Sequence, residues 1–200
     1  TTMHMGASDV MTAVMMSIMS GAEVSGICIT AVTSMAQMRA AAMSGGMIDA
    51  NITAANTTVG NYFMMSNLLT TQPVDMTMAG SGTAGGVTQD EINHGAAIAA
   101  MSQYAHGLGM STSSGFVTAM MDDASDGMMD GMMGSTQIQM GGMMGGGMGG
   151  MMDSTAGWSG MATAMSDFMD SPAVNHSGLT STDMNALIQA LSASNGMLSP

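Results

Sequence analysis

The chain has almost no cations. Arg39 is its single Lys or Arg residue, against 14 acidic residues, which gives a formal net charge of −13. A surface with one guanidinium has little with which to neutralise phosphates, so we expect no nucleic-acid binding and no attraction to an anionic membrane. A field of this sign favours metal cations as partners.

Cysteine and long apolar runs are also scarce. Cys28 is the single cysteine, which excludes an internal disulfide and a cysteine-based zinc site. It has no histidine close by in the sequence, so we expect a buried, unreactive thiol, and we expect the four scattered histidines to be hydrogen-bonded surface residues. No apolar run is long enough to insert into a membrane. The start of the chain lacks the basic region of a signal peptide, which fits a processed form or a fragment of a longer protein.

Methionine takes the place of the scarce aliphatic residues. It accounts for 33 of 200 residues and brings the apolar content to 46%. A low aliphatic content with high net charge would otherwise indicate disorder, but methionine lets the chain bury a core of flexible side chains. Because only 8% of residues are charged, we expect a surface of small polar residues, as in a secreted or assembled protein.

The spacing of apolar residues predicts an all-α protein, an irregular bundle of about seven short helices with a Gly/Met-rich irregular segment. We expect a single helical domain over residues 1–200, with candidate sub-bundles 1–125 and 153–200 joined by the Gly/Met-rich segment 126–152. The clearest helix start is the capping box of Thr88 and Glu91. No strand pattern is convincing. The expected helices cover residues 9–20, 30–43, 48–63, 88–106, 115–124 and 156–169, and a last one runs from Thr180 or Thr182 to Gly196.

Five short phrases follow one another along the chain. They are TAVTSMA at 30–36, AAN with Val59 and Phe63 at 54–63, TTQPVD at 70–75, HGAAIAAMSQYA at 94–105 and DGMMDG at 126–131. In this order they resemble a helical region of uncharacterised bacterial envelope proteins and lipoproteins, over about residues 28–131 and faintly over 172–180. The resemblance implies an exported, non-enzymatic helical module that is secreted, periplasmic or on the surface of a bacterium.

The chain departs from that family by having methionine where leucine is usual. This favours core packing for the methionines at those positions, which are Met35, Met101, Met120 and Met129.

Two other methionine-rich stretches have no periodic core face. Residues 140–152 contain only Met and Gly, and residues 3–5 read Met-His-Met. Thioethers and imidazole are ligands for soft ions such as Cu(I) and Ag(I), and glycine frees the backbone to wrap an ion. The candidate ligands are Met3, His4, Met5, Met140, Met143, Met144, Met148, Met151 and Met152.

A short acidic stretch resembles part of a calcium loop. Three of the ligand positions of such a loop are occupied by Asp122, Asp126 and Asp130. However, Ala124 and Met133 stand where an EF-hand needs acids. The three aspartates are therefore candidate ligands of a partial or shared Ca²⁺ site. The alternative is a helix end followed by a solvated acidic turn.

Together these patterns favour an exported, Met-rich protein that binds Cu(I) or Ag(I) through thioethers for buffering or storage and is not an enzyme. The alternative is a structural subunit or module of a bacterial cell-surface or extracellular assembly, self-associating as a homo-oligomer, with methionine as core filler. A third hypothesis is a sacrificial oxidant sink, because methionine sulfoxide is reversible where reductases reach it.

Overall fold

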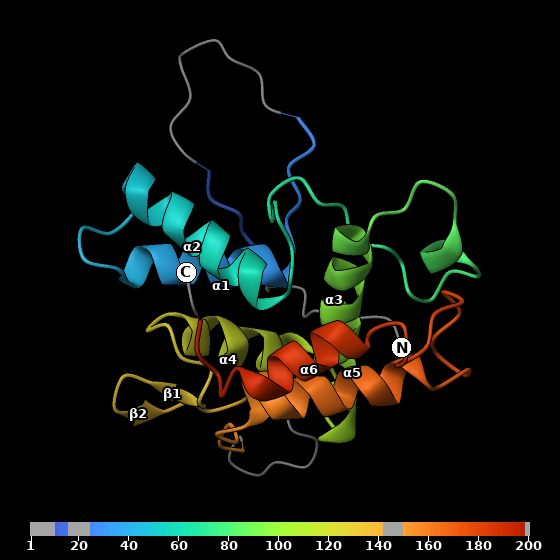
Figure 1. Cartoon of the computed structure of the whole chain (residues 1–200). Helices are drawn as coiled ribbons and strands as arrows, with labels where there is room; N and C mark the ends of the chain where they lie inside the picture. The colour runs from blue at the N-terminus through green and yellow to red at the C-terminus, as the bar shows by residue number, and fades with distance from the viewer. Residues whose placement is uncertain (1–10, 16–24, 142–149, 199–200) are drawn as a thin grey trace.

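The computed structural model describes residues 11–15, 25–141 and 150–198 (Figure 1). These residues are mostly helical, as the sequence predicted, with six α-helices where about seven were expected. None of the helices in the described residues is long and apolar enough to cross a bilayer. The α-helices are α1 (Ala31–Ala42), α2 (Asp49–Tyr62), α3 (Gln89–Gly107), α4 (Ser114–Ala124), α5 (Met161–Met169) and α6 (Asn185–Ala193).

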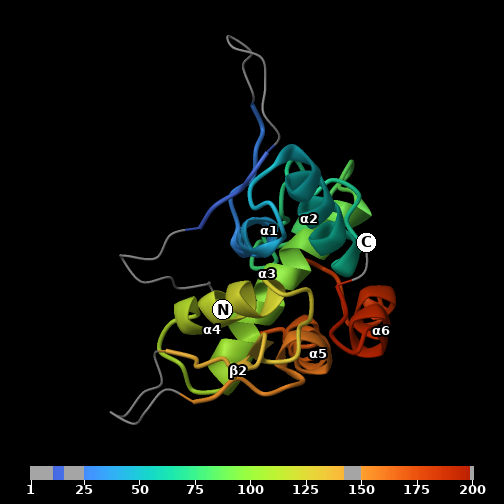
Figure 2. The ribbon, with the colours of Figure 1, turned by 90° about the vertical axis from the view of Figure 1, so that its left-hand side faces the viewer.

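The six helices of the described residues pack against one another (Figures 1 and 2). Helix α1 lies against α2 and α4, and α5 lies against α3 and α6. One cluster of buried apolar side chains includes residues from all six helices. Residues before and after the Gly/Met-rich segment therefore share the same core.

Methionine fills much of this core. The prediction that Met35, Met101, Met120 and Met129 pack inside is confirmed, because none of the four has any exposed surface. Flexible thioether side chains can fill the irregular spaces between short helices. Further buried methionines are Met65, Met76, Met110, Met140, Met152, Met161, Met165, Met169 and Met184.

The starts of α1 and α3 follow from local chemistry. The backbone amide of Glu91 donates to the Thr88 hydroxyl at 3.3 Å, and the Thr88 amide donates to the Glu91 carboxylate at 2.8 Å, which confirms the predicted capping box. Thr30 and Thr33 form the same reciprocal arrangement at the start of α1. Each box satisfies amides that lack a partner within the helix.

The prediction of a helix over residues 9–20 is wrong for the part of this range that the structure describes. Residues 11–15 are not helical, and the remainder of that range lies outside the described residues. The Thr12 amide donates to the Ser34 hydroxyl at 2.7 Å, and the hydroxyl of Thr33 donates to the Thr12 carbonyl at 2.8 Å. Hydroxyls of α1 thus satisfy backbone groups that a helix would have paired internally.

The second half of the chain departs from the prediction in three places. Strands β1 (Met132–Met133) and β2 (Thr136–Gln137) form an antiparallel hairpin where no strand was expected. The helix expected over 156–169 begins with a π-helical turn, η2 (Ala156–Gly160), before α5. The last helix begins at Asn185, because Thr180 and Asp183 hydrogen-bond to each other in a turn that precedes it. The first half of the chain also contains a short 3-10 turn, η1 (Ser81–Thr83), which precedes α3.

Arg39 has a structural role. Its guanidinium donates to the carbonyl of Ser125 at 3.0 Å, at the end of α4, where carbonyls lack helical partners. Gly127 has a φ of 96° and lies against the same guanidinium, where an added Cβ would come within 2.9 Å of it. The arginine thereby ties α1 to the turn that leads into β1.

Candidate functional site

Three of the predicted soft-metal ligands lie in the part of the chain that the structure describes. Met140 and Met152 are buried in the hydrophobic core, whereas Met151 is 48% exposed. The other predicted ligands, Met3, His4, Met5, Met143, Met144 and Met148, lie outside the described residues. Met140 and Met152 therefore act as core packing, and the side chain of Met151 reaches solvent.

An antiparallel bridge between Gln139 and Met151 explains this division. The amides of Met140 and Met152 donate to carbonyls across the bridge at 2.8 Å each. Side chains alternate between the two faces of such a ladder. Met140 and Met152 consequently enter the core, while Gln139 and Met151 lie on the exposed face.

A second antiparallel bridge pairs Met128 with Met197, far apart in the sequence. The Met129 amide donates to the Gly196 carbonyl at 2.7 Å. On the other side of the pair, the Leu198 amide donates to the Gly127 carbonyl at 3.0 Å. Residues paired between such bonds have Cα atoms about 4.5 Å apart and side chains on one face. Met197 is 56% exposed and Met128 is half-buried, so two thioethers are neighbours at the surface.

The β1–β2 hairpin connects the two bridges, and its first strand adds a third exposed thioether. Met133 in β1 is 48% exposed. We use the name methionine surface for Met128, Met133, Met151 and Met197, the partly or fully exposed methionines of these connected segments, of which strand pairing places Met128 beside Met197. Sequence reasoning identified only Met151 as a ligand, although the repeated DGMM at 126–133 was an available signal.

The candidate calcium ligands lie in α4 and in the loop that leads from α4 to β1. The Asp126 carboxylate accepts the Met128 amide at 3.0 Å and the amide of Gly134, in the turn between β1 and β2, at 2.7 Å. Asp130 accepts the Met132 amide at 3.1 Å. Burial raises the pKa of Asp122. Within the described residues, no three acidic, histidine or cysteine side chains are grouped so that they could hold a metal ion. Calcium binding by Asp122, Asp126 and Asp130 stays a prediction from the sequence.

Asp123, which sequence reasoning did not single out, is a buried carboxyl group with no exposed surface. Its Oδ1 accepts from the Gly131 amide at 2.8 Å, and its Oδ2 has no hydrogen-bond partner among the described residues. An added Cβ at Gly157 would lie 3.1 Å from Oδ2, so the glycine in η2 leaves little free space beside it. Burial raises the pKa of Asp123 to about 7. Burial, together with the Asp123 charge, also raises the pKa of Tyr62.

His94 and Cys28 share a single hydrogen-bond acceptor. His94 Nδ1 lies 2.8 Å from the carbonyl oxygen of Thr71, and the Cys28 thiol donates to the same oxygen at 3.2 Å. The imidazole Nε2 lies 2.9 Å from the Thr30 hydroxyl, so both ring nitrogens have partners. The expectation of a surface His94 is wrong, because its side chain is buried, and burial lowers its pKa.

His94 lies near Cys28 in space although the two residues are far apart in the sequence. The prediction of a buried thiol is confirmed, and burial raises the pKa of Cys28. A thiol with a raised pKa is mostly protonated and a weak nucleophile at neutral pH. The shared carbonyl therefore joins the segment before α1 to α3, and we assign this cluster to stability.

No protein-family model, curated protein or solved structure matches the chain. The resemblance of residues 28–131 to bacterial envelope proteins and lipoproteins therefore stays a prediction from the sequence.

Proposed function

We propose that the protein binds soft monovalent metal ions, Cu(I) or Ag(I), through the thioethers of the methionine surface, and that it buffers or stores the metal rather than catalysing a reaction. The observation that carries this proposal is the Met128–Met197 pair, in which a strand bridge puts two thioethers on one face. Cu(I) and Ag(I) accept few ligands and prefer sulfur, so a thioether pair whose backbones are joined by a strand bridge is a suitable core for such a site.

The net charge of −13 supports the same proposal, because it raises the local concentration of cations around the molecule. Met151 emerges from the Gln139 bridge on the solvent-exposed face and is a candidate further donor. The sequence-predicted ligands Met143, Met144 and Met148 belong to the proposal as additional donors.

Replacing the thioether pair should weaken metal binding without unfolding the protein. We expect Met128→Leu together with Met197→Leu to reduce Ag(I) affinity by about tenfold or more, equivalent to roughly 1.4 kcal/mol. Leucine has a similar volume and hydrophobicity but no lone pair, so the bridge itself should remain. The measurement is an Ag(I) titration against a competing thioether chelator, with circular dichroism to check the fold.

The matched control replaces Met47 and Met78 by leucine. Both side chains are exposed, at 45% and 60%, but they lie in separate connections, before α2 and before η1. The control should retain the affinity of the unmodified protein. Equal weakening in both double variants would show that any exposed methionine serves, and would contradict a site at the bridge. A separate triple variant, Met143→Leu with Met144→Leu and Met148→Leu, measures what those additional donors contribute.

The rival hypothesis of a structural subunit is favoured by a different observation. Ile29 and Ile48 are 58% and 51% exposed, which is unusual for large aliphatic side chains. Such side chains could contact further copies of the chain in a cell-surface assembly. Light scattering on the titrated samples separates the two hypotheses, because a metal-independent oligomer would support the assembly and a metal-binding monomer would support the metal site.

A further inference from the structure

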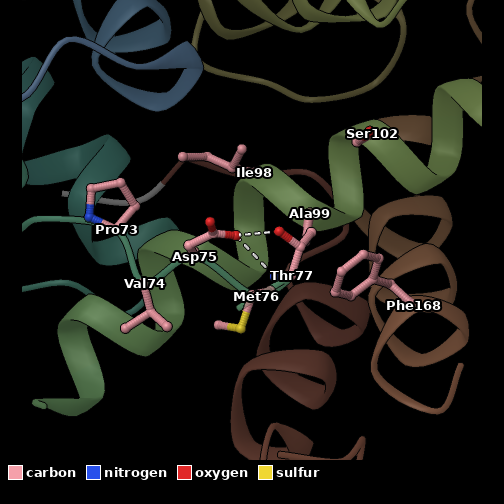
Figure 3. A pocket seen from close by; sticks show the side chains of 10 residues that line it. Pro73, Val74, Asp75, Met76, Thr77, Ile98, Ala99, Ser102 and Phe168 are labelled. Atoms are coloured by element: carbon pink, nitrogen blue, oxygen red, sulfur yellow. Dashed lines mark hydrogen bonds between the residues drawn. The ribbon is translucent and has the colours of Figure 1, made fainter. Parts of the chain in front are cut away.

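A small pocket, lined by none of the four residues of the methionine surface, lies between the segment that precedes η1 and the helices α3 and α5 (Figure 3). Its volume is about 260 Å³. Most of its wall is apolar, with Val74 and Met76 on one side, Ile98 on α3, and Phe168 on α5. A pocket of this size and lining suits a small molecule with a short apolar body.

The wall formed by residues 73–77 is held close to α3. The Val74 amide donates to the Glu91 carbonyl at 3.1 Å. At Gly95, an added Cβ would lie only 2.2 Å from the Val74 carbonyl oxygen and 3.1 Å from the Met76 methyl group. The backbone thus approaches α3 at a point where only glycine fits, and this contact fixes the shape of the pocket.

Asp75 is the one ionisable side chain among the lining residues that the structure describes. Its Oδ1 accepts from the amide of Thr77 at 2.9 Å and from the Thr77 hydroxyl at 2.6 Å. Figure 3 shows the second carboxylate oxygen turned away from Thr77. The hydrogen bonds from Thr77 lower the pKa of Asp75, so the carboxylate carries its charge at neutral pH.

We propose that this pocket binds a small organic cation, with its ammonium group on the carboxylate of Asp75 and its short apolar body against Met76, Ile98 and Phe168. An ammonium group forms charge-assisted hydrogen bonds with the exposed carboxylate of Asp75, and the apolar walls favour a few carbon atoms over a hydrated inorganic ion. The net charge of −13 attracts positively charged ligands to the protein. This inference stands on different residues from the metal proposal and does not depend on it.

The test uses n-butylammonium chloride as the probe, with butan-1-ol and butyrate as uncharged and anionic analogues of the same shape. We expect amide NMR shifts from butylammonium at residues 73–77 and on the facing turns of α3, with a millimolar dissociation constant. Butan-1-ol should bind at least about tenfold more weakly, and butyrate should not bind, because the charge contributes roughly 1.4 kcal/mol or more. Equal binding of butan-1-ol and butylammonium, or shifts confined to other regions, would overturn the proposal.

Asp75→Asn tests the carboxylate, and Asp153→Asn is its matched control. Asp153 accepts the amide and hydroxyl of Thr155 on Oδ1, at 2.8 and 2.6 Å, which repeats the arrangement of Asp75 and Thr77 outside the pocket. We expect about tenfold weaker binding in Asp75→Asn only. Ala99→Leu, on a lining position of α3, should abolish binding by filling the pocket. Equal effects of the two asparagine variants would contradict the proposal.

Discussion

Replacing Asp123 by asparagine is expected to stabilise the fold at about pH 8 and to flatten the dependence of its stability on pH. Asp123 is buried, has an unpaired Oδ2 and has a pKa raised to about 7, against an ordinary value of 3.8. Between these two values the folded protein keeps a proton that the unfolded chain has lost. The contribution of Asp123 to stability therefore falls as pH rises through this window, and the cost is complete above the folded pKa.

The size of the effect follows from the pKa difference. A raised pKa of about 7 for Asp123 means that this group's contribution to the free energy of unfolding is lower by up to about 4 kcal/mol at alkaline pH than at acid pH. Asparagine retains an oxygen for the Gly131 amide and carries no charge. We expect Asp123→Asn to recover most of this difference at about pH 8 and little of it near pH 4. Urea unfolding of both proteins across this range gives the comparison.

Asp153→Asn is the control, because the pKa of Asp153 is shifted in the opposite direction from that of Asp123. The hydrogen bonds from Thr155 lower the pKa of Asp153, so its charge stabilises the fold above its unfolded pKa, and that contribution is lost as pH falls. Its replacement should not stabilise the protein at about pH 8. If Asp123→Asn destabilised the fold at that pH, or shifted it equally at every pH, the buried carboxylate would not be a source of instability.

Gly95→Ala is expected to destabilise the protein by about 3 kcal/mol, because the new methyl group would overlap a backbone carbonyl rather than a movable side chain. The distance from the added Cβ to the Val74 oxygen would be 2.2 Å. Relief requires residues 73–77 to move away from α3, which breaks the hydrogen bond between Val74 and Glu91. Denaturant unfolding at one pH measures the loss.

The same helix supplies the control. Gly107 is the last residue of α3, and an added Cβ there has no atom within 4 Å. Since alanine favours helix over glycine, Gly107→Ala should leave stability unchanged or raise it by up to about 1 kcal/mol. Equal stabilities of the two variants would mean that the segment before η1 does not pack against α3 as described.

Local chemistry made the helices predictable. The starts of α1 and α3 are encoded by Thr30 and Thr88 together with a residue three positions later, so no tertiary information is needed. The spacing of apolar residues then located the bodies of α2 and α4. The segment at 11–15 was misjudged because hydroxyls of another element satisfy its backbone.

The candidate site depended on pairing between distant segments. Composition marked Met140 and Met152 as ligands, but alternation along a strand ladder puts them in the core. The pairing of Met128 with Met197 depends on strand register, which no local period encodes. In the same way, the burial of Asp123 depends on the packing of η2 against the end of α4.

The most direct test of soft-metal binding at the methionine surface is an NMR titration of protein labelled with ¹³C at the methionine methyl groups, in which each of the 33 methionines gives its own signal. Signals are assigned by single Met→Leu replacements, and Ag(I) is added stepwise. We predict that the Met128 and Met197 methyl signals shift together, in step with the bound metal, while core methionines such as Met35, Met101 and Met120 do not shift. Unchanged signals from Met128 and Met197 at saturating Ag(I), or shifts spread evenly over all exposed methionines, would contradict the proposed site.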